Sequence, residues 1–496
     1  MRAARAVAEV VVAGAGVAGL AAALVMGRDG HRVTLLERDP TPLPSTPEEA
    51  FAWDRRGAPQ VRHSHAFLAR LRNLLRDAYP DVLDDLFAAG ATELRFLANL
   101  PPEFPDRTEY PGDEDLVALA CRRTTFEWAL RRIVTRIPDV TLRDGVSVVG
   151  TTATPGAVPS LTGFVLQSES GRETIGGDVF VAAHGRRADV PALVADHDVH
   201  IDEEVEDTGI VYFSRFYRLT DGVEPPGQAR PVGGDLGYLK FGLFQGDNHT
   251  FSMTLACGSG DDELRSRLGR SDGFDRAAST IVDARPWLDP TVSRPITDTY
   301  VMARLLNRRR CFLDDDGTPR VQRFVALGDA HTCTNPLYGR GCSLAFVQAT
   351  LLGDALGRHE EDPVELVRAF ESATDEEITP WYRAAVAQDA ANRRAVARRP
   401  RAAGEVGSTS DEAEVDPRDF MREVLRDGLL PALRTDPVVL RAFLRSLNLL
   451  QPPEQLLADT DVISRVMTVY QERDQRPAEP PAGVSRDELL ALLDAR

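Results

Sequence analysis

The segment VAEVVVAGAGVAGLAAALVMGRDGHRVTLLER, residues 7–38, decides the fold of this chain. The three consecutive valines at residues 10–12 are β-branched and do not alternate with polar residues, which is typical of a parallel strand buried on both faces. Three glycines follow at once. Gly14 permits a tight turn, Gly16 lets backbone amides approach a pyrophosphate, and Gly19 allows the next helix to lie close to the strand. The segment therefore predicts a strand that enters a phosphate-binding turn.

The residues after this turn complete the pattern. A helix is predicted from Ala18 to about Arg28, and its N-terminus would point the positive end of its dipole at the phosphate. Gly30 ends the helix, and residues 32–36 form a second strand. Glu37 follows roughly 20 residues after the glycines, where a carboxylate can accept hydrogen bonds from an adenosine ribose. With its strand, helix and acid, the motif predicts a Rossmann-like dinucleotide-binding unit rather than glycines used only for packing.

Length and charge limit the classes of function. The chain has 496 residues and a net charge of −18, so we expect two or three subdomains and no general affinity for nucleic acid or anionic membranes. Arg2 and Arg5 precede an apolar run, as in a signal peptide, but Glu9 interrupts the run and the glycine motif explains it better. We expect no integral membrane segment.

Lysine and cysteine usage narrow the chemistry further. Lys240 is the only lysine, so no other side-chain amine could form a Schiff base or shuttle protons. The five cysteines are odd in number and form no CxxC pair. Neither a disulfide framework nor a zinc site is predicted, and the chain fits a reducing cytoplasm.

A second glycine-containing motif, FVALGDAHTCTNPLYGRG, covers residues 324–341. A strand is predicted to end just before Asp329, where a carboxylate can bind hydroxyl groups. Gly339 and Gly341 would free the N-terminus of a helix over residues 342–356 for close ligand approach. Alone, this pattern could be another strand-to-helix turn. Together with the first motif it favours a flavin clamp.

Two polar groupings allow alternative interpretations. His63 and His65 lie in a loop before a helix predicted over residues 66–79, and a polar loop or cofactor contact is favoured over a metal because a third ligand is not evident. Arg123, Glu127 and Arg131 share one helical face. They could form a surface salt-bridge ladder, or Arg123 could reach a phosphate, and the sequence leaves both open.

The remaining chain divides into strand-rich and helical parts. Beyond residue 196 the pattern becomes antiparallel and aromatic, which suits a sheet that closes over a ligand, although aromatic residues also serve ordinary sheets. The part after residue 363 is mostly helical, could form a cap or a dimer surface, and includes a segment expected to be flexible, residues 393–417. The strands expected in the antiparallel part are residues 210–218, 238–245 and 250–256.

These motifs resemble those of the FAD-dependent monooxygenases of the para-hydroxybenzoate hydroxylase fold. The loop GAPQVRHSH, residues 57–65, resembles the branch that includes the flavin epoxidases of polyether biosynthesis. The resemblance covers about residues 7–355. It implies an α/β fold, with a Rossmann-like FAD-binding domain, an inserted antiparallel-sheet substrate domain and a helical C-terminal region. The implied segments are 1–80, 111–195 and 319–360 for FAD binding, 81–110 and 196–318 for substrate, and 361–496 for the helical region.

The resemblance also assigns roles to individual residues. Glu37 would bind the adenosine ribose with Arg38 beside the adenine, Asp329 would bind the ribityl hydroxyls, and the helix at Gly341 would face the flavin pyrimidine ring. His65 and Tyr338 are candidates for lining the flavin site, but no catalytic residue is predicted. The full set implied to bind FAD is Gly14, Gly16, Gly19, Glu37, Arg38, Arg62, Arg123, Asp329, Gly339 and Gly341, with Arg62 and Arg123 along the pyrophosphate and ribityl chain.

The chain departs from the family's pattern at two places, and the first departure bears on the electron donor. The middle motif, AAHGRRA at residues 182–188, keeps only the glycine and arginine of the usual D-A-x-G-R-x-S run. Since that motif helps to hold FAD and a nicotinamide donor, NADPH or NADH could act directly or through a separate flavin reductase. Arg340 also stands where the branch often has glutamine.

The implied activity is insertion of one oxygen atom from O2 into a hydrophobic small molecule of secondary metabolism, through a flavin C4a-hydroperoxide. Hydroxylation and epoxidation both fit. One alternative is an FAD-dependent reductase or dehydrogenase that resembles the geranylgeranyl reductases. A flavin halogenase ranks lower, because that family relies on an active-site lysine and usually a WxWxIP stretch. A flavin-fold binding protein without turnover is the third alternative.

Overall fold

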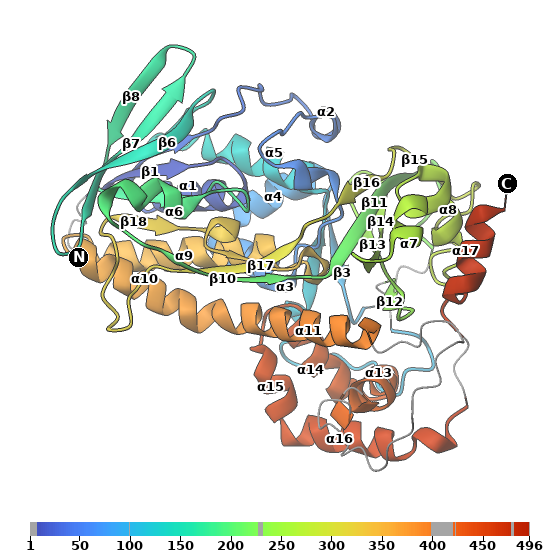
Figure 1. Ribbon diagram of the computed structural model, residues 1–496. Helices are drawn as coiled ribbons and strands as arrows, with labels where there is room; N and C mark the ends of the chain where they lie inside the picture. The colour runs from blue at the N-terminus through green and yellow to red at the C-terminus, as the bar shows by residue number, and fades with distance from the viewer. Residues whose placement is uncertain are drawn as a thin grey trace.

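The computed structural model describes residues 7–98, 100–226, 232–397, 420–421, 423–477 and 481–495. At its centre lies a five-stranded parallel sheet with the strand order β18-β9-β1-β2-β5 (Figure 1). The first motif supplies its middle, because β1 pairs in parallel with both β2 and β9. The five strands are β1 (Glu9–Ala13), β2 (Arg32–Leu36), β5 (Val140–Arg143), β9 (Val179–Ala182) and β18 (Phe324–Ala326).

Different layers cover the two faces of this sheet. On one face α1 (Val17–Arg28) packs between α5 (Arg123–Val134) and α9 (Gly341–His359). The opposite face packs against a three-stranded antiparallel sheet through Phe164, Phe180 and other buried side chains, and Figure 1 shows that sheet on the side away from α9. Its strands are β6 (Ser147–Thr154), β7 (Ser160–Ser168) and β8 (Gly171–Gly176). The predicted Rossmann-like unit is confirmed.

A second, mainly antiparallel sheet has the order β12-β13-β14-β11-β15, with β16 also paired to β11. It lies beside the parallel sheet in Figure 1. The helices α7 (Asp262–Leu268) and α8 (Ser271–Ser279) pack on one face of this sheet. The opposite face can therefore turn toward the parallel sheet. The strands are β11 (Ile210–Leu219), β12 (Gly233–Asp235), β13 (Leu239–Gln245), β14 (Thr250–Gly258), β15 (Ser293–Pro295) and β16 (Tyr300–Met302).

Short elements connect these parts. β10 (Asp202–Asp207) pairs with β17 (Leu306–Cys311), which also pairs with β19 (Thr332–Cys333), and Figure 1 shows β10 and β17 running between the two large sheets. The helix predicted from residue 66 begins only at Ala69, because Phe67 is extended and pairs with Leu119. The other short elements are α2 (Pro47–Phe51), α3 (Ala69–Ala78), α4 (Pro80–Ala88), β3 (Thr92–Arg95), β4 (Val117–Ala120) and α6 (Val190–Val194).

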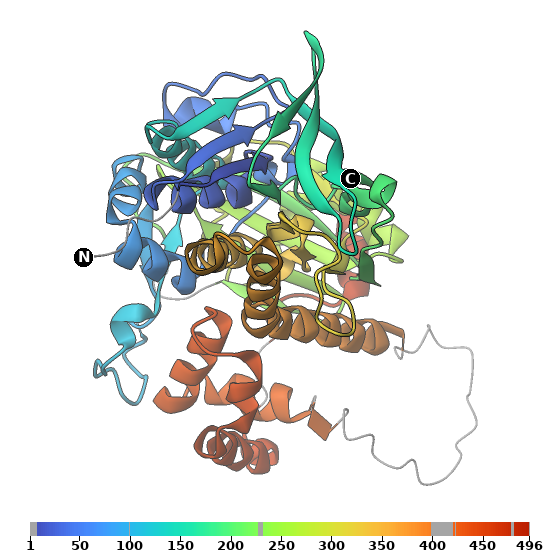
Figure 2. The same ribbon diagram turned by 90° about the vertical axis from the view of Figure 1, so that its left-hand side faces the viewer.

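The C-terminal region is helical, as predicted. α10 packs on α9, and α11 contacts β17. α17 (Arg486–Asp494) packs on α7 and α8, with Asp494 paired to Arg267, while Figure 2 shows the red-orange helices α13 to α16 as a separate group below the sheets. Residues 393–397 of the segment expected to be flexible form the end of α11, and residues 398–417 lie outside the described residues. The helices are α10 (Pro363–Glu377), α11 (Thr379–Ala397), α13 (Leu430–Ala432), α14 (Pro437–Leu447), α15 (Pro453–Ala458) and α16 (Thr460–Gln471). In the described part of the chain, none of the helices has the length and apolar character that crossing a membrane requires.

A buried ion pair joins the parallel-sheet part to the antiparallel sheet. Asp247, in the turn between β13 and β14, accepts hydrogen bonds from the backbone amide and the guanidinium of Arg122, at 2.7 and 2.6 Å. The Thr125 hydroxyl donates to the same carboxylate at 2.8 Å. Asp247 is 0% exposed, so removing it would leave a buried guanidinium uncompensated.

We expect Asp247→Ala to lower the free energy of unfolding by roughly 3 to 5 kcal/mol, because it breaks a buried pair from one side. Asp272→Ala is the matched control, since its ion pair with Arg270 is exposed and such pairs contribute at most about 1 kcal/mol. Urea denaturation of both variants measures the difference. Equal losses would mean that the Arg122–Asp247 contact does not hold the two parts together.

Candidate active site

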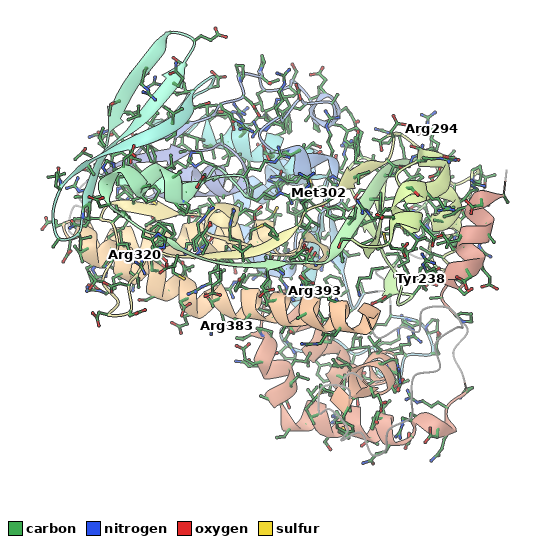
Figure 3. The ribbon with its side chains drawn as sticks, in the orientation of Figure 1. Tyr238, Arg294, Met302, Arg320, Arg383 and Arg393 are labelled. Carbon is green, nitrogen blue, oxygen red and sulfur yellow. The ribbon has the colours of Figure 1, made fainter. Side chains whose placement is uncertain are left out.

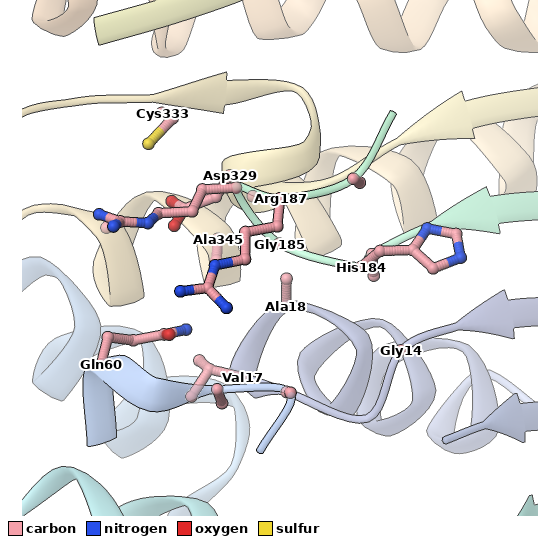
Figure 4. Close-up of a pocket in the computed structure, with 18 of the residues that line it drawn as sticks. Gly14, Val17, Ala18, Gln60, His184, Gly185, Arg187, Asp329, Cys333 and Ala345 are labelled. Carbon is pink, nitrogen blue, oxygen red and sulfur yellow. The ribbon is translucent and has the colours of Figure 1, made fainter. Parts of the chain in front are cut away.

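A cavity of about 490 Å³ lies where the two glycine motifs meet the antiparallel sheet. Figure 4 shows Val17 and Ala18, at the start of α1, facing Asp329 and Ala345 across it, with Gln60 at one end and His184 at the other. The antiparallel sheet contributes Tyr212, Phe244 and Met302 to the wall, and Figure 3 places Met302 between the two parts of the molecule. Of the ten residues implied to bind FAD, those lining the cavity are Gly14, Gly16, Glu37, Arg38, Arg123, Asp329, Gly339 and Gly341.

The glycines of the first motif have different physical requirements. Gly14 has a φ of +108°, and a Cβ there would lie 2.5 Å from the Ala183 carbonyl oxygen. A Cβ on Gly19 would lie 1.8 Å from the Gly14 carbonyl oxygen, so the helix can approach the strand only without a side chain. Gly16 would meet nothing within 4 Å, and no side chain caps α1. The first amides of α1 therefore face open space that suits a phosphate.

The second motif presents an unsatisfied carboxylate. Asp329 lines the cavity, and burial raises the pKa of its carboxyl group. Among the described residues no hydrogen bond to either carboxylate oxygen is found. Gly339 allows the following turn at a φ of +67°, packed against Ala66. A half-buried carboxylate that faces the cavity without donors from the described residues fits a ligand that carries hydroxyl groups, as the ribityl chain of FAD does.

Glu37 belongs to a buried charge network. Its carboxylate accepts hydrogen bonds from the backbone amides of Ala15 and Asp39 at 3.2 and 3.0 Å, and from Arg55 at 3.2 Å. Arg55 also pairs with Glu127 at 2.6 Å. This network holds the end of β2 against the glycine turn and keeps Glu37 on the cavity wall.

Glu127 extends the network along α5 to Arg123, at 3.4 Å. Burial opposes ionisation of Glu127, but Arg55 and Arg123 hold its pKa below the usual value. The surface-ladder interpretation of Arg123, Glu127 and Arg131 is wrong, because these three residues are 8%, 0% and 2% exposed. Arg55, from the loop after β2, lies against this face of α5 and pairs with Glu127. Arg123 faces the cavity, as the phosphate interpretation requires.

The histidine pair supports this wall through hydrogen bonds. His65 Nδ1 lies 2.9 Å from the His63 carbonyl oxygen, and since a carbonyl can only accept, the proton is on Nδ1. His65 Nε2 then accepts from Arg123 at 3.3 Å. Burial and Arg123 lower the pKa of His65 to about 3, so the ring is neutral at physiological pH. His63 Nδ1 lies 3.2 Å from the Ser214 hydroxyl.

Three predicted site residues differ from expectation. Arg62 is outside the cavity wall and stacks over the Tyr300 ring, 5.7 Å from its centroid. Tyr338 is turned to α11, where its hydroxyl donates to Asp389 at 2.7 Å, so it does not line the cavity. Gly19 lies behind the turn rather than on its surface. The directions of these side chains depend on loop conformations, which no local sequence pattern predicts.

Sequence reasoning missed several residues of the wall. Arg55, Gln60, His184 and Arg187 contribute to the FAD-facing side. Ala182 stands where the D-A-x-G-R-x-S run has its acid, and His184 takes the variable position. The two ring nitrogens of His184 are buried without a hydrogen-bond partner among the described residues, and burial lowers its pKa to about 4. The odd HGRR run was the available signal for His184 and Arg187.

Comparison with known proteins agrees with this site. Residues 9–42 match the model of the family described as FAD binding domain. No curated protein sequence matches the chain. The flavin-dependent brominase Bmp2 superposes with a TM-score of 0.59 at 15% identity, covering 95% of this chain and 100% of Bmp2.

Two oxygenases have similar structures. PqsL from Pseudomonas aeruginosa, described as a probable FAD-dependent monooxygenase, gives a TM-score of 0.54 at 15% identity over 79% of this chain and 99% of its own. The anhydrotetracycline hydroxylase OxyS from Streptomyces rimosus gives 0.54 at 21% identity over 89% and 76%. The chain has the fold of these flavoproteins. The family match at residues 9–42 covers the first glycine motif, the part of this fold expected to bind FAD.

We expect Gly16→Ala to fold normally but to bind FAD at least tenfold more weakly, because the added methyl group meets no protein atom and occupies the open ligand side. Gly260→Ala, which also has open space and lies outside the cavity wall, is the control. Titration of the apoprotein with FAD and thermal unfolding separate the two effects. Unchanged FAD affinity in Gly16→Ala would exclude the start of α1 as the phosphate site.

We expect acid to destabilise the protein through His65. Its pKa falls from 6.5 to about 3 on folding, so only the unfolded state takes up this proton as the pH drops below 6.5. Stability present at pH 7 is therefore lost between about pH 6.5 and 3, by about 2 kcal/mol at pH 5 for one such group. His65→Gln should lose correspondingly less between pH 7 and 5 in urea denaturation. His200→Gln, at an exposed histidine, should lose as much as the unmodified protein, and equal losses in both variants would contradict the assignment.

Proposed function

We propose that this protein is an FAD-dependent monooxygenase that inserts one oxygen atom from O2 into a hydrophobic small molecule, by hydroxylation or epoxidation. The observation that carries the proposal is the shared cavity: its FAD-facing wall carries the two glycine motifs, and its other wall carries Tyr212, Phe244 and Met302 from the antiparallel sheet. A substrate held by that sheet would lie beside the cofactor. The polyether epoxidase branch is the specific relationship that we propose.

The residues present fit FAD. The open start of α1 at Gly16 would take the diphosphate, Glu37 the adenosine ribose, and Asp329 the ribityl hydroxyls, while Arg123 is oriented toward the cavity by His65 and Glu127. Reduced FAD supplies the activation of O2. The protein's part is to bind, orient and exclude water, so the apolar Phe244 and Met302 on the substrate side matter more than any acid or base.

A halogenase is a weaker candidate, although Bmp2 has the same fold. Lys240, the only lysine, lies in β13, forms an ion pair with Asp235 and does not line the cavity. The cavity wall therefore lacks the lysine that lysine-dependent halogenation requires. A reductase or dehydrogenase remains the second candidate, since the same cavity could hold FAD and a substrate to be reduced or oxidised.

The electron donor belongs to the same proposal. Ala182 stands where the D-A-x-G-R-x-S run has its acid, and its methyl group cannot replace a carboxylate that accepts hydrogen bonds. We propose NADPH or NADH as the source of electrons, either directly or through a separate flavin reductase. We also propose a cytoplasmic location, which the five free cysteines support.

The test is a visible spectrum followed by anaerobic addition of NADPH or NADH. We expect a yellow protein whose flavin absorbance bleaches, then recovers in air through a transient near-ultraviolet absorbance, because O2 reacts with the reduced cofactor in a water-excluded site. A protein that bleaches only with an added flavin reductase supports the two-component form.

Two outcomes would contradict the proposal. A protein that cannot be reconstituted with FAD is not a flavoenzyme. Rapid reoxidation without the transient absorbance, with product formed only under anaerobic conditions, would favour the reductase or dehydrogenase. In either case Gly16→Ala provides the matched protein with impaired FAD binding.

A further inference from the structure

Arg340, in the second glycine motif, is a cation that forms no ion pair with the residues that the structure describes. It lines the cavity just before the start of α9, and no carboxylate of the described residues lies within ion-pair distance of it. Its Nε atom is buried and has no hydrogen-bond partner, while one Nη donates to the Trp381 carbonyl oxygen at 3.4 Å. A guanidinium has five N–H donors, so most of its hydrogen-bonding capacity is unused.

Two aromatic rings hold the guanidinium in place. Its central carbon lies 4.9 Å from the Tyr338 ring centroid and 4.9 Å from that of Trp381, on α11. Such contacts favour a cation but do not satisfy its N–H groups. Burial lowers the pKa of Arg340 to about 10, so it is still charged at neutral pH.

The nearest carboxylate is occupied by other groups. Asp389, on α11, accepts hydrogen bonds from the side chains of Asn307, Asn335 and Tyr338 at 2.7, 2.8 and 2.7 Å. These bonds fix the loop that carries Arg340, because Asn335 and Tyr338 belong to it. Asp389 therefore positions the arginine without forming an ion pair with it, and the guanidinium is pre-organised for a ligand.

The charge of the cavity points the same way. The whole chain carries a net charge of −18, yet six arginines and only three acidic residues line this cavity. Part of this positive charge, around the start of α1, would be neutralised by the FAD diphosphate. Arg340 lies instead at the start of α9, whose dipole adds to its attraction for an anion.

We propose that Arg340 is the anion-binding residue of the substrate pocket, and that the substrate is a hydrophobic molecule with a carboxylate or a similar delocalised anion. This proposal rests on the monooxygenase proposed above for its substrate class. The anion would pair with the guanidinium, while Phe244 and Met302 contact its apolar part. The reduced flavin ring is a second source of delocalised negative charge, and the experiment distinguishes the two.

The probe is hexanoate, compared with hexanamide as a neutral molecule of the same length. Binding is followed by tryptophan fluorescence, because Trp381 stacks on Arg340, in both the apoprotein and the FAD-loaded protein. We expect Arg340→Gln to weaken hexanoate binding at least tenfold and to leave hexanamide binding unchanged. The hexanoate affinity of Arg340→Lys should lie between those of the unmodified protein and Arg340→Gln, since lysine keeps the charge but lacks the planar guanidinium. Arg473→Gln, which removes an arginine stacked on Tyr470 outside the cavity wall, should match the unmodified protein.

The midpoint potential of bound FAD separates the two sources. If Arg340→Gln lowers the potential and leaves hexanoate binding unchanged, the anion is the reduced flavin and the substrate assignment is overturned. If neither changes, Arg340 binds no anion. Arg340-dependent hexanoate binding by a protein that cannot take up FAD would support the anion site and contradict the monooxygenase. The thermal stability of each variant checks that it folds, and Arg340→Lys tests the proposal should Arg340→Gln not fold.

Discussion

The close approach of α1 to the end of β1 is the constraint on which the rest of the structure depends. With the Gly14 carbonyl oxygen 1.8 Å from where a Cβ of residue 19 would lie, the first turn of the helix must carry a glycine at that position. This contact turns the first amides of α1 toward the cavity. It also lets α1 sit between α5 and α9, so that helices from three distant parts of the chain form one layer.

Buried charge then shapes the cavity walls. Arg55 connects Glu37 with Glu127, and Glu127 connects with Arg123, so a loop after β2 and a helix after β4 are held around the same space. Burial opposes ionisation of Glu127, but Arg55 and Arg123 beside it hold the pKa of its carboxyl group below the usual value. Asp247 performs the same task at the border with the antiparallel sheet. The wall with the two glycine motifs is held by these charge pairs, whereas the antiparallel sheet contributes Tyr212, Phe244 and Met302.

The C-terminal region is part of this arrangement. Through Asp389 and Trp381, α11 holds the loop of residues 335–341, although the sequence of α11 contains no recognisable motif. Tyr338 illustrates the difficulty: its position in the motif suggested a flavin contact, and only the packing of α11 shows that its hydroxyl is used by Asp389. A buried acid that serves three neutral donors cannot be recognised from neighbouring residues.

The sequence by itself determined the parallel sheet, both glycine motifs and the antiparallel sheet. These follow from local periodicity and backbone requirements, which glycine and β-branched residues express directly. Only the tertiary structure decided that Arg123, Glu127 and Arg131 are buried and that Arg62 faces Tyr300. It also decided that Arg340 forms no ion pair within the described part of the chain. The physical reason is that burial and charge pairing depend on side chains far apart along the chain, such as Arg55 with Glu127, and no local pattern records them.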